Sequence, residues 1–271
     1  DVPVLTAVDV AGVITEGSSV LTDSGSITFA DVDLADRPTA VEATTSVTAV
    51  KADSSSLTLS AAQKVAIEDA FSIASASGNT NNGTVNWTYN IAEADLDFLA
   101  KDEVVTAVFT VTVDDGASST TTQDVTITIT GTNDAPQVES TALTGAVTEL
   151  TVAPVGNLTG TGTFTFTDVD LTDGHTTPSV ASSSGALGAL TASVTTSATG
   201  GVTGEVTWNY SVAASAVEYL AAGELKEETF TVTLNDGNGG TTTKDVVITI
   251  TGTNDVPVLT AVDVAGVITE G

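Results

Sequence analysis

The stretch Thr130-Gly131-Thr132-Asn133-Asp134-Ala135-Pro136 decides how this chain is organised. It recurs as TGTNDVP at residues 251–257, and the chain starts within the same motif, at Asp1-Val2-Pro3. Each complete copy follows an alternating run of Thr, Val and Ile, which is typical of a strand. The motif therefore marks the point where the last strand of one module ends and the next module begins.

Aligning Asp1, Asp134 and Asp255 divides the chain into repeating modules. We predict a first module at residues 1–133, a second at 134–254, and the first strand of a third at 255–271. Matching stretches in the two modules include FADVDL and FTDVDL, VNWTY and VTWNY, and FTVTVDDG and FTVTLNDG. Residues 255–271 repeat residues 1–17 without a change, so we expect the longer protein to repeat a block of two modules.

The strands expected within a module are short and alternate polar with apolar residues. In module one they are expected at residues 4–14, 26–29, 84–91, 104–113 and 121–129, with one or two weaker strands near residues 41–50 and 55–59. Some seven strands in a unit of this size predict an all-β chain of tandem immunoglobulin-like sandwiches. Trp87 and Trp208 are expected to anchor the two cores; stacking against a sugar is the less favoured interpretation.

Module one also carries an insertion, near residues 60–71, that module two lacks. Ser60 and Gln63 have the spacing of a capping box, so a short helix is expected to begin here. The helical period would turn Val65, Ala66, Ala70 and Phe71 toward the protein. The insertion is interpreted as a cover for a sandwich edge in preference to a lid over a ligand.

The composition of the 271 residues excludes several classes of function. Six basic residues face 35 acidic ones, a formal charge of -29, which argues against binding nucleic acid or anionic membranes. No apolar run is long enough for a membrane span, and no cysteine is present for a disulfide or a thiolate. The one histidine, His175, is expected to be a solvated loop residue, and no catalytic set repeats between the modules. We therefore expect a monomeric protein that is not an enzyme.

Sandwich topology predicts that the acidic motifs gather at the ends of the modules, because alternate loops lie at alternate ends. Where module one meets module two, we expect one metal site. It would be formed by Glu16, Glu103, Asn133, Asp134, Asp168, Asp170 and Asp236. Partial sites are expected at the outer ends: Asp1, Asp31, Asp33 and Asp115 at one, and Glu149, Glu224, Asn254 and Asp255 at the other.

Calcium is the cation that this set of residues predicts. Several carboxylates close together repel by roughly 1 kcal/mol per pair even in a water-like dielectric, and a divalent cation reverses that repulsion. Calcium takes 6–8 oxygen ligands in flexible geometry, whereas magnesium prefers to keep its waters. Zinc and copper favour His and Cys, which the chain almost lacks. The alternative is that Asp-rich loops are only turns, and for any single Asp-x-Asp motif that interpretation is preferred.

The ordered motifs resemble the VCBS repeat, a cadherin-like module of giant bacterial adhesins of the RTX type exported by type I secretion. The resemblance covers nearly all of both modules. In module two it is carried by FTDVD at 166–170, Trp208 and Tyr210, LAAGE at 220–224, FTVT at 230–233, NDG at 235–237 and ITGTND at 250–255. Gly131 departs from the pattern of cadherin linkers, which place another Asp there, and a second Asn after Asp134 is missing. One or two ions are therefore expected at the joint.

The resemblance implies an extender segment of a surface adhesin from a Gram-negative bacterium, with a role in adhesion or biofilm formation. Its partners would be the neighbouring repeats of the same chain, and calcium would stiffen the joints between them. The alternative from another class is a carbohydrate- or protein-binding module. That alternative predicts exposed aromatic residues in the loops, where the sequence has few.

Overall fold

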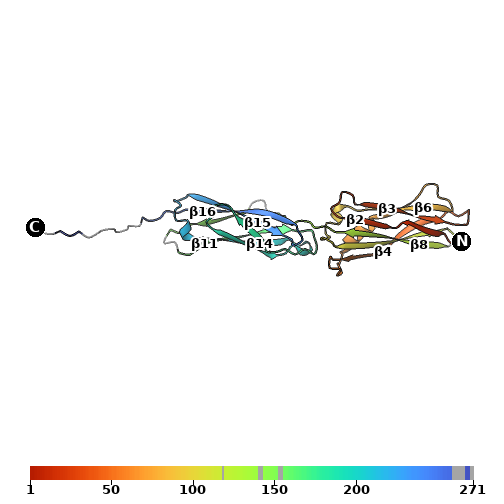
Figure 1. Ribbon diagram of the computed structural model, residues 1–271, viewed down its shortest axis with the longest axis horizontal. Coiled ribbons are helices and arrows are strands. Elements are labelled where there is room, and N and C mark those ends of the chain that lie inside the picture. Colours follow the sequence, from red (N-terminus) through yellow and green to blue (C-terminus); the bar gives the residue numbers. More distant parts are fainter. Residues whose placement is uncertain (118, 140–142, 152–154, 258–265, 269–271) are drawn as a thin grey trace.

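Two β-sandwiches lie end to end along the chain (Figure 1). The computed structural model describes residues 1–117, 119–139, 143–151, 155–257 and 266–268. The strands of module one are β1 (Val4–Asp9), β2 (Ala11–Thr15), β3 (Thr22–Ala30), β4 (Thr39–Val50), β5 (Phe71–Ser75), β6 (Asn82–Asn90), β7 (Val104–Asp114) and β8 (Thr120–Thr130). Those of module two are β9 (Gln137–Val138), β10 (Leu143–Thr148), β11 (Asn157–Thr167), β12 (Ser179–Ser182), β13 (Ala189–Thr196), β14 (Gly204–Ala213), β15 (Leu225–Asn235) and β16 (Thr241–Thr251).

Each module is a pair of four-stranded sheets. The sheet orders are β1-β3-β6-β5 and β2-β8-β7-β4 in module one, and β13-β14-β11-β9 and β10-β16-β15-β12 in module two. Alternation along β7 sends every second residue, from Val105 to Val113, into the core with no exposed surface. Trp87 and Trp208 are buried in the two cores, as predicted. The chain is thus all-β, with sandwiches of immunoglobulin-like architecture.

The first segment of the chain is two strands, and the predicted single strand at residues 4–14 was wrong. β1 pairs antiparallel with β3, and β2 pairs parallel with β8 in the opposite sheet. Between them, Val10 offers its carbonyl to the N–H of Thr126. Residues 55–59 form no strand; Ser56 makes only an isolated bridge to Val50. The described part of each module therefore has eight strands, where about seven were expected.

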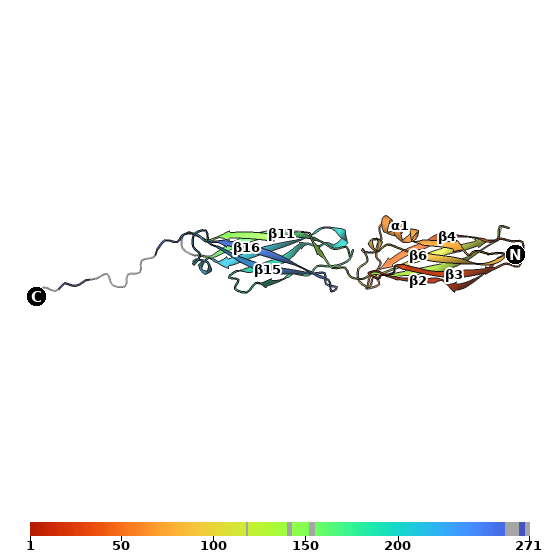
Figure 2. The ribbon, with the colours of Figure 1, turned by 90° about the horizontal axis from the view of Figure 1, so that it is seen from above.

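The predicted insertion forms a helix, α1 (Ala61–Asp69), outside the sandwich and toward the joint (Figure 2). Ser60 and Gln63 form the predicted capping box. The inward residue is Ile67, which has no exposed surface, whereas Val65, predicted to face inward, is 52% exposed. The carbonyl of Ile67 accepts a 3.2 Å hydrogen bond from the Tyr89 hydroxyl, which ties α1 to β6. In the described part of the chain no helix has the length and apolarity to cross a membrane.

In module two, a buried carboxylate takes the place of the helix carbonyl as the acceptor for the equivalent tyrosine hydroxyl. Tyr210, the counterpart of Tyr89, donates its hydroxyl to Glu228 Oε2 at 2.8 Å. Glu228 also accepts the N–H groups of Leu187 and Gly188, so it holds the loop before β13 against the sandwich. The predicted third-module strand at 255–271 falls largely outside the described residues.

Candidate metal centre

The linker between the modules is shaped by close packing at Gly131. A Cβ at this residue would lie 2.5 Å from the carbonyl oxygen of Ala100, so only glycine fits against the turn before β7. The N–H of Gly131 donates to Glu103 O at 2.8 Å, and the N–H of Thr132 donates to Glu16 Oε2 at 2.7 Å. Close packing therefore explains why this position, where cadherin linkers place an Asp, is a glycine. Where the linker leaves module one, the hydrogen bond from Thr132 holds it to Glu16.

Three acidic side chains form a first acidic group at the C-terminal end of module one. One oxygen each of Glu16, Asp97 and Asp134 lies within 4.8 Å of the other two. Glu16 is 2% exposed, and its Oε1 has no hydrogen-bond partner. Burial raises the pKa of Glu16 to about 8, and repulsion from the neighbouring acidic side chains adds to the shift. The site thus opposes ionisation of a group that is normally charged at neutral pH.

A second acidic group, at the N-terminal end of module two, faces the first. Asp168, Asp170 and Asp173 follow β11, are all buried, and bring one oxygen each within 4.8 Å of the others. Asp170 Oδ2 accepts the N–H of Asp134 at 3.0 Å, so the two groups meet at the linker. Burial raises the pKa of Asp170 to about 8, with repulsion from Asp173 and Asp168 adding to the shift. The pKa values of Asp134, Asp168 and Asp173 are raised as well, chiefly by burial.

Asp236, in the loop between β15 and β16, lies beside this group and contacts the linker at Asn133. Its Oδ1 accepts the N–H groups of residues 238–240, which fixes the loop. Its Oδ2 accepts Asn133 Nδ2 at 2.9 Å, and this bond turns the Asn133 carbonyl oxygen away, where it has no partner. Asp173 Oδ1 accepts Asn238 Nδ2 at 2.6 Å while its Oδ2 stays unpartnered.

Glu103 lies at the joint, but its oxygens are already engaged. Oε2 accepts the N–H of Ala100 at 3.1 Å, and Oε1 accepts the hydroxyl of Thr172 at 2.7 Å. The second bond crosses from module one to module two. A further bridge runs from the N–H of Leu171 to Phe98 O at 3.1 Å. Glu103 thus fastens the two modules together, and the structure gives it no free oxygen toward the acidic groups.

The four unpartnered atoms at the joint are all oxygens: Glu16 Oε1, Asn133 Oδ1, Asp170 Oδ1 and Asp173 Oδ2. Ionised carboxylates and amide carbonyls only accept hydrogen bonds, so they cannot satisfy one another. A buried acceptor without a partner costs about 1–3 kcal/mol, and more if it is charged. The joint therefore has the chemistry of a site for a hard cation, and its oxygen donors fit calcium.

His175 is buried at the edge of this site, and the expectation of a solvated loop residue was wrong. Its side chain has no exposed surface. Nε2 lies 3.1 Å from Asp168 Oδ2, and Nδ1 lies 3.0 Å from Ser197 Oγ. The ring packs edge-on against Phe166, with centroids 4.7 Å apart. His175 thereby positions Asp168, one of the predicted ligands.

The outer ends of the chain repeat the two halves of the joint. At the N-terminal end, Asp31, Asp36 and Asp115 lie together, while the exposed Asp33 binds the amino group of Asp1 at 2.5 Å. At the C-terminal end, Glu149, Glu218 and Asp255 lie together. Four carboxylate oxygens at these ends are without partners, namely Asp31 Oδ2, Asp115 Oδ2, Glu149 Oε1 and Glu218 Oε1, as is the hydroxyl oxygen of Thr253.

Two other residues predicted for the C-terminal end are occupied locally. Glu224 Oε2 accepts the N–H of Ala221 at 3.0 Å, in the same position as Glu103 in module one. Asn254 Nδ2 donates to Asp255 O at 3.1 Å, as Asn133 does to Asp134.

Four acidic residues of these groups were missed by the sequence reasoning: Asp36, Asp97, Asp173 and Glu218. Repetition between the modules would have revealed the pair Asp97 and Glu218. Glu218 follows Asp97 by the 121 residues that separate Asp255 from Asp134, and both positions lie just after the short helical turn that follows the strand with the Trp and Tyr.

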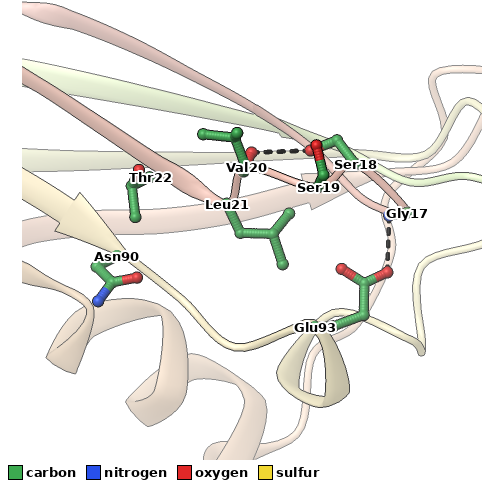
Figure 3. A pocket seen from close by; sticks show the side chains of 8 residues that line it. All are labelled: Gly17, Ser18, Ser19, Val20, Leu21, Thr22, Asn90 and Glu93. Carbon is green, nitrogen blue, oxygen red and sulfur yellow. Dashed lines mark hydrogen bonds between the residues drawn. The ribbon is translucent and has the colours of Figure 1, made fainter.

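A pocket lies beside the joint on module one (Figure 3). Its volume is about 670 Å³, and its lining runs from Gly17 to Thr22, with Asn90 and Glu93 opposite. Glu93 accepts the N–H of Gly17 at 2.7 Å, which holds the loop after β2 near Glu16. None of the lining residues is aromatic, so the pocket lacks the stacking surface that the carbohydrate-binding alternative predicts.

No family model matches the sequence, and no curated protein matches it. Among solved structures, a fragment of human CDH23, repeats EC21-23, is 16% identical with a TM-score of 0.39, over 93% of this chain and 69% of that one. Mouse Cadherin-23 EC22-24 is 13% identical with a TM-score of 0.38, over 93% and 66%. CfaE, the adhesive subunit of the CFA/I fimbria of enterotoxigenic Escherichia coli, is 11% identical with a TM-score of 0.36, over 65% of each chain. With identities of 11% to 16% and TM-scores of 0.36 to 0.39, these likenesses carry no conclusion about the ligands, partners or role of this chain.

Proposed function

We propose that this chain is a structural extender segment whose joint is rigidified by calcium. The observation that carries the proposal is the set of four buried, unpartnered oxygens between the modules. They come from both sandwiches and from the linker, so cations held at the two neighbouring acidic groups would restrain all three parts. Rigidity of the joint, more than any chemistry, is what such a site would supply.

The residues best suited to hold cations are Glu16, Asp97 and Asp134 in one group and Asp170 and Asp173 in the other. Asn133 adds a neutral carbonyl oxygen that no donor occupies. Extracellular calcium modules bind with dissociation constants of about 10⁻⁴–10⁻³ M, which matches a protein that meets calcium outside the cell. Binding to the folded state alone would also stabilise the sandwiches.

The setting we propose is a large adhesin on the surface of a Gram-negative bacterium, secreted by a type I system. The segment would hold a distal ligand-binding region away from the cell, for adhesion or biofilm formation. The VCBS-like motifs support this setting, as does the end-to-end arrangement of the sandwiches. In this role the segment has no enzymatic activity, and its partners are the neighbouring repeats.

Small-angle scattering and thermal melting test the proposal together. With millimolar calcium we expect a single extended particle and a higher melting temperature; with chelator we expect a broader distribution of dimensions and a lower one. Glu16→Gln should lose most of the calcium effect, and the exposed Glu42→Gln, which makes the same chemical change on β4, should keep it. If calcium alters neither dimensions nor melting of the unsubstituted chain, the proposal fails.

A further inference from the structure

A row of hydrogen bonds beside the second acidic group fixes which ring nitrogen of His175 carries a proton. Nδ1 lies 3.0 Å from Ser197 Oγ, and Ser197 Oγ lies 2.7 Å from Thr199 Oγ1. The Thr199 hydroxyl in turn bonds the carbonyl oxygen of Asp173. A carbonyl only accepts, so Thr199 donates to Asp173 and must itself accept from Ser197. Ser197 then accepts from Nδ1–H, which leaves Nε2 as the nitrogen with the lone pair in the neutral ring.

The lone pair of Nε2 faces a carboxylate oxygen of the second acidic group. Nε2 lies 3.1 Å from Asp168 Oδ2, and neither side chain has any exposed surface. Two acceptors at this distance repel each other unless a proton or a cation lies between them. Two ligands of one zinc ion, each about 2.1 Å from the metal, lie about 3.0–3.4 Å apart. The pair therefore has the spacing of neighbouring zinc ligands.

Each aspartate of this group has one oxygen held by a hydrogen bond. Asp168 Oδ1 accepts the N–H of Asp170 at 3.2 Å, and Asp170 Oδ2 accepts the N–H of Asp134 at 3.0 Å. Asp173 Oδ1 accepts Asn238 Nδ2 at 2.6 Å. The second oxygens of Asp170 and Asp173 are without partners, and both side chains are buried. Ligands oriented by such outer hydrogen bonds are typical of metal sites.

The donors left over are three carboxylate oxygens and one imidazole nitrogen. Zinc binds His nitrogen and Asp oxygen, and structural zinc sites are almost always four-coordinate. A hollow of about 510 Å³ between the modules gives a route to the group from solvent. Helix α1 lines one side of it, and Thr167, Asp168 and Val169 line the other.

Module one has no nitrogen donor at the equivalent place. The stretches FADVDLADRP at 29–38 and FTDVDLTDGH at 166–175 align, with Pro38 opposite His175. The residue before the proline is Arg37, whose guanidinium donates to two nearby backbone carbonyls. The histidine thus distinguishes the acidic group of module two from that of module one.

We propose that the second acidic group is a zinc site, with Nε2 of His175 and one oxygen from each of its three aspartates as ligands. Calcium takes oxygen ligands, whereas imidazole suits zinc, so the nitrogen favours zinc here. The first acidic group has oxygen donors only and remains a calcium site. Without zinc, calcium occupies both groups. The inference deepens the proposed function and rests on it for the presence of cations at the joint.

Calorimetric titration with zinc, in saturating calcium, tests the choice of metal. We expect one zinc ion per chain, bound in the micromolar range. Ser197→Ala should lower the zinc affinity about 10–100-fold, because Nδ1 loses the acceptor that orients the ring. His175→Gln should lower it further, because a ligand is lost. Ser193→Ala, the same change at an exposed position of β13, is the matched control and should bind zinc normally.

NMR of the imidazole reports ligation directly, because His175 is the one histidine in the sequence. Zinc should shift the nitrogen resonance of Nε2 to the metal-bound range, while Nδ1 keeps its proton toward Ser197. This measurement needs no substitution, so it decides the matter even if His175→Gln fails to fold. Fluorescence of Trp208 shows whether each variant retains the core of module two.

The zinc site and the calcium joint fail in different ways. Zinc affinity unchanged in His175→Gln, or zinc bound while the imidazole resonances stay in place, would overturn the zinc site. A chain that binds calcium but no zinc would also overturn it and leave the proposed function standing. Zinc bound through His175 in a chain without any calcium response would support the zinc site and count against the proposed function. Glu16→Gln should keep the zinc and lose most of the calcium effect.

Discussion

Replacing Asp170 with Asn should stabilise the protein without calcium and destabilise it, relative to the unsubstituted chain, with calcium. Asp170 has no exposed surface; its Oδ2 accepts the N–H of Asp134, and its Oδ1 has no partner. The amide keeps the shape and can still accept that bond. It removes a charge that the buried site resists, and also one oxygen donor that a cation would use.

The magnitude follows from the raised pKa. Burial shifts the pKa of Asp170 from 3.8 to about 8, so between these values the folded state holds the proton more tightly than the unfolded state. Stability is therefore lost as pH rises through this window. At about 1.4 kcal/mol per pKa unit, the stability lost between pH 3.8 and pH 7.5 is on the order of 5 kcal/mol. Part of this is repulsion shared with neighbouring carboxylates and part is relieved by solvent, so we expect Asp170→Asn to gain roughly 2 kcal/mol in chelator.

With calcium, the unsubstituted chain should become more stable than Asp170→Asn, the reverse of their order in chelator. With a dissociation constant of about 10⁻⁴ M, roughly 10 mM calcium adds about 2.7 kcal/mol to the folded state of the unsubstituted chain. Asp170→Asn should gain only a small part of that, because the amide oxygen is a weaker ligand and the site has lost a charge.

Urea denaturation at pH 7.5 measures both effects. A Trp87→Phe background leaves Trp208, in the core of module two, as the fluorescent reporter. The control is Asp33→Asn, the equivalent change at the exposed N-terminal end of module one. Destabilisation by Asp170→Asn in chelator, or an equal calcium effect in both proteins, would contradict this prediction.

Three further predictions concern other parts of the fold. In chelator, the melting temperature should fall as the pH rises from about 5 to about 8. The pKa values of Glu16 and Asp170 are raised to about 8, so their protonated forms favour folding. Saturating calcium should flatten this pH profile, and a melting temperature that rises with pH in chelator would count against the assignment. Gly131→Ala should lower stability by about 1–3 kcal/mol, since its Cβ meets backbone 2.5 Å away; chemical denaturation checks it, and a neutral result would show that the turn yields. Tyr210→Phe should cost about 1–3 kcal/mol in the same assay by taking a hydrogen bond from buried Glu228, and no loss would mean that the loop N–H groups suffice.

The fold could be predicted from the sequence because its signals are local and repeated. Alternation along strands such as β7 and the position of Trp87 indicate a core-facing side without reference to distant residues. The crossing of the chain from one sheet to the other at Val10 could not be predicted, because β1 and β2 show the same two-residue alternation. What separates them is a choice of partner strand, β3 or β8, which the alternation does not encode.

The candidate site could be predicted as a set of converging loops, but not atom by atom. Topology brings the loops of Asp168, Asp170 and Asp236 to the linker, as expected. It does not show that Glu103 uses both oxygens in hydrogen bonds to Ala100 and Thr172. Nor does it show Asp97, whose side chain is placed by a short helical turn with no strand period. Side-chain direction in turns depends on hydrogen bonds that only the folded chain makes.

Isothermal titration calorimetry with calcium is the decisive measurement for a cation at the joint. We predict one or two ions bound per chain at the joint, with dissociation constants of about 10⁻⁴–10⁻³ M near neutral pH. Binding should be lost in Glu16→Gln and Asp170→Asn and kept in Asp31→Asn, whose carboxylate lies at the far end of module one. An absence of binding at millimolar calcium, or binding that survives both joint substitutions unchanged, would show that the joint is not a calcium site.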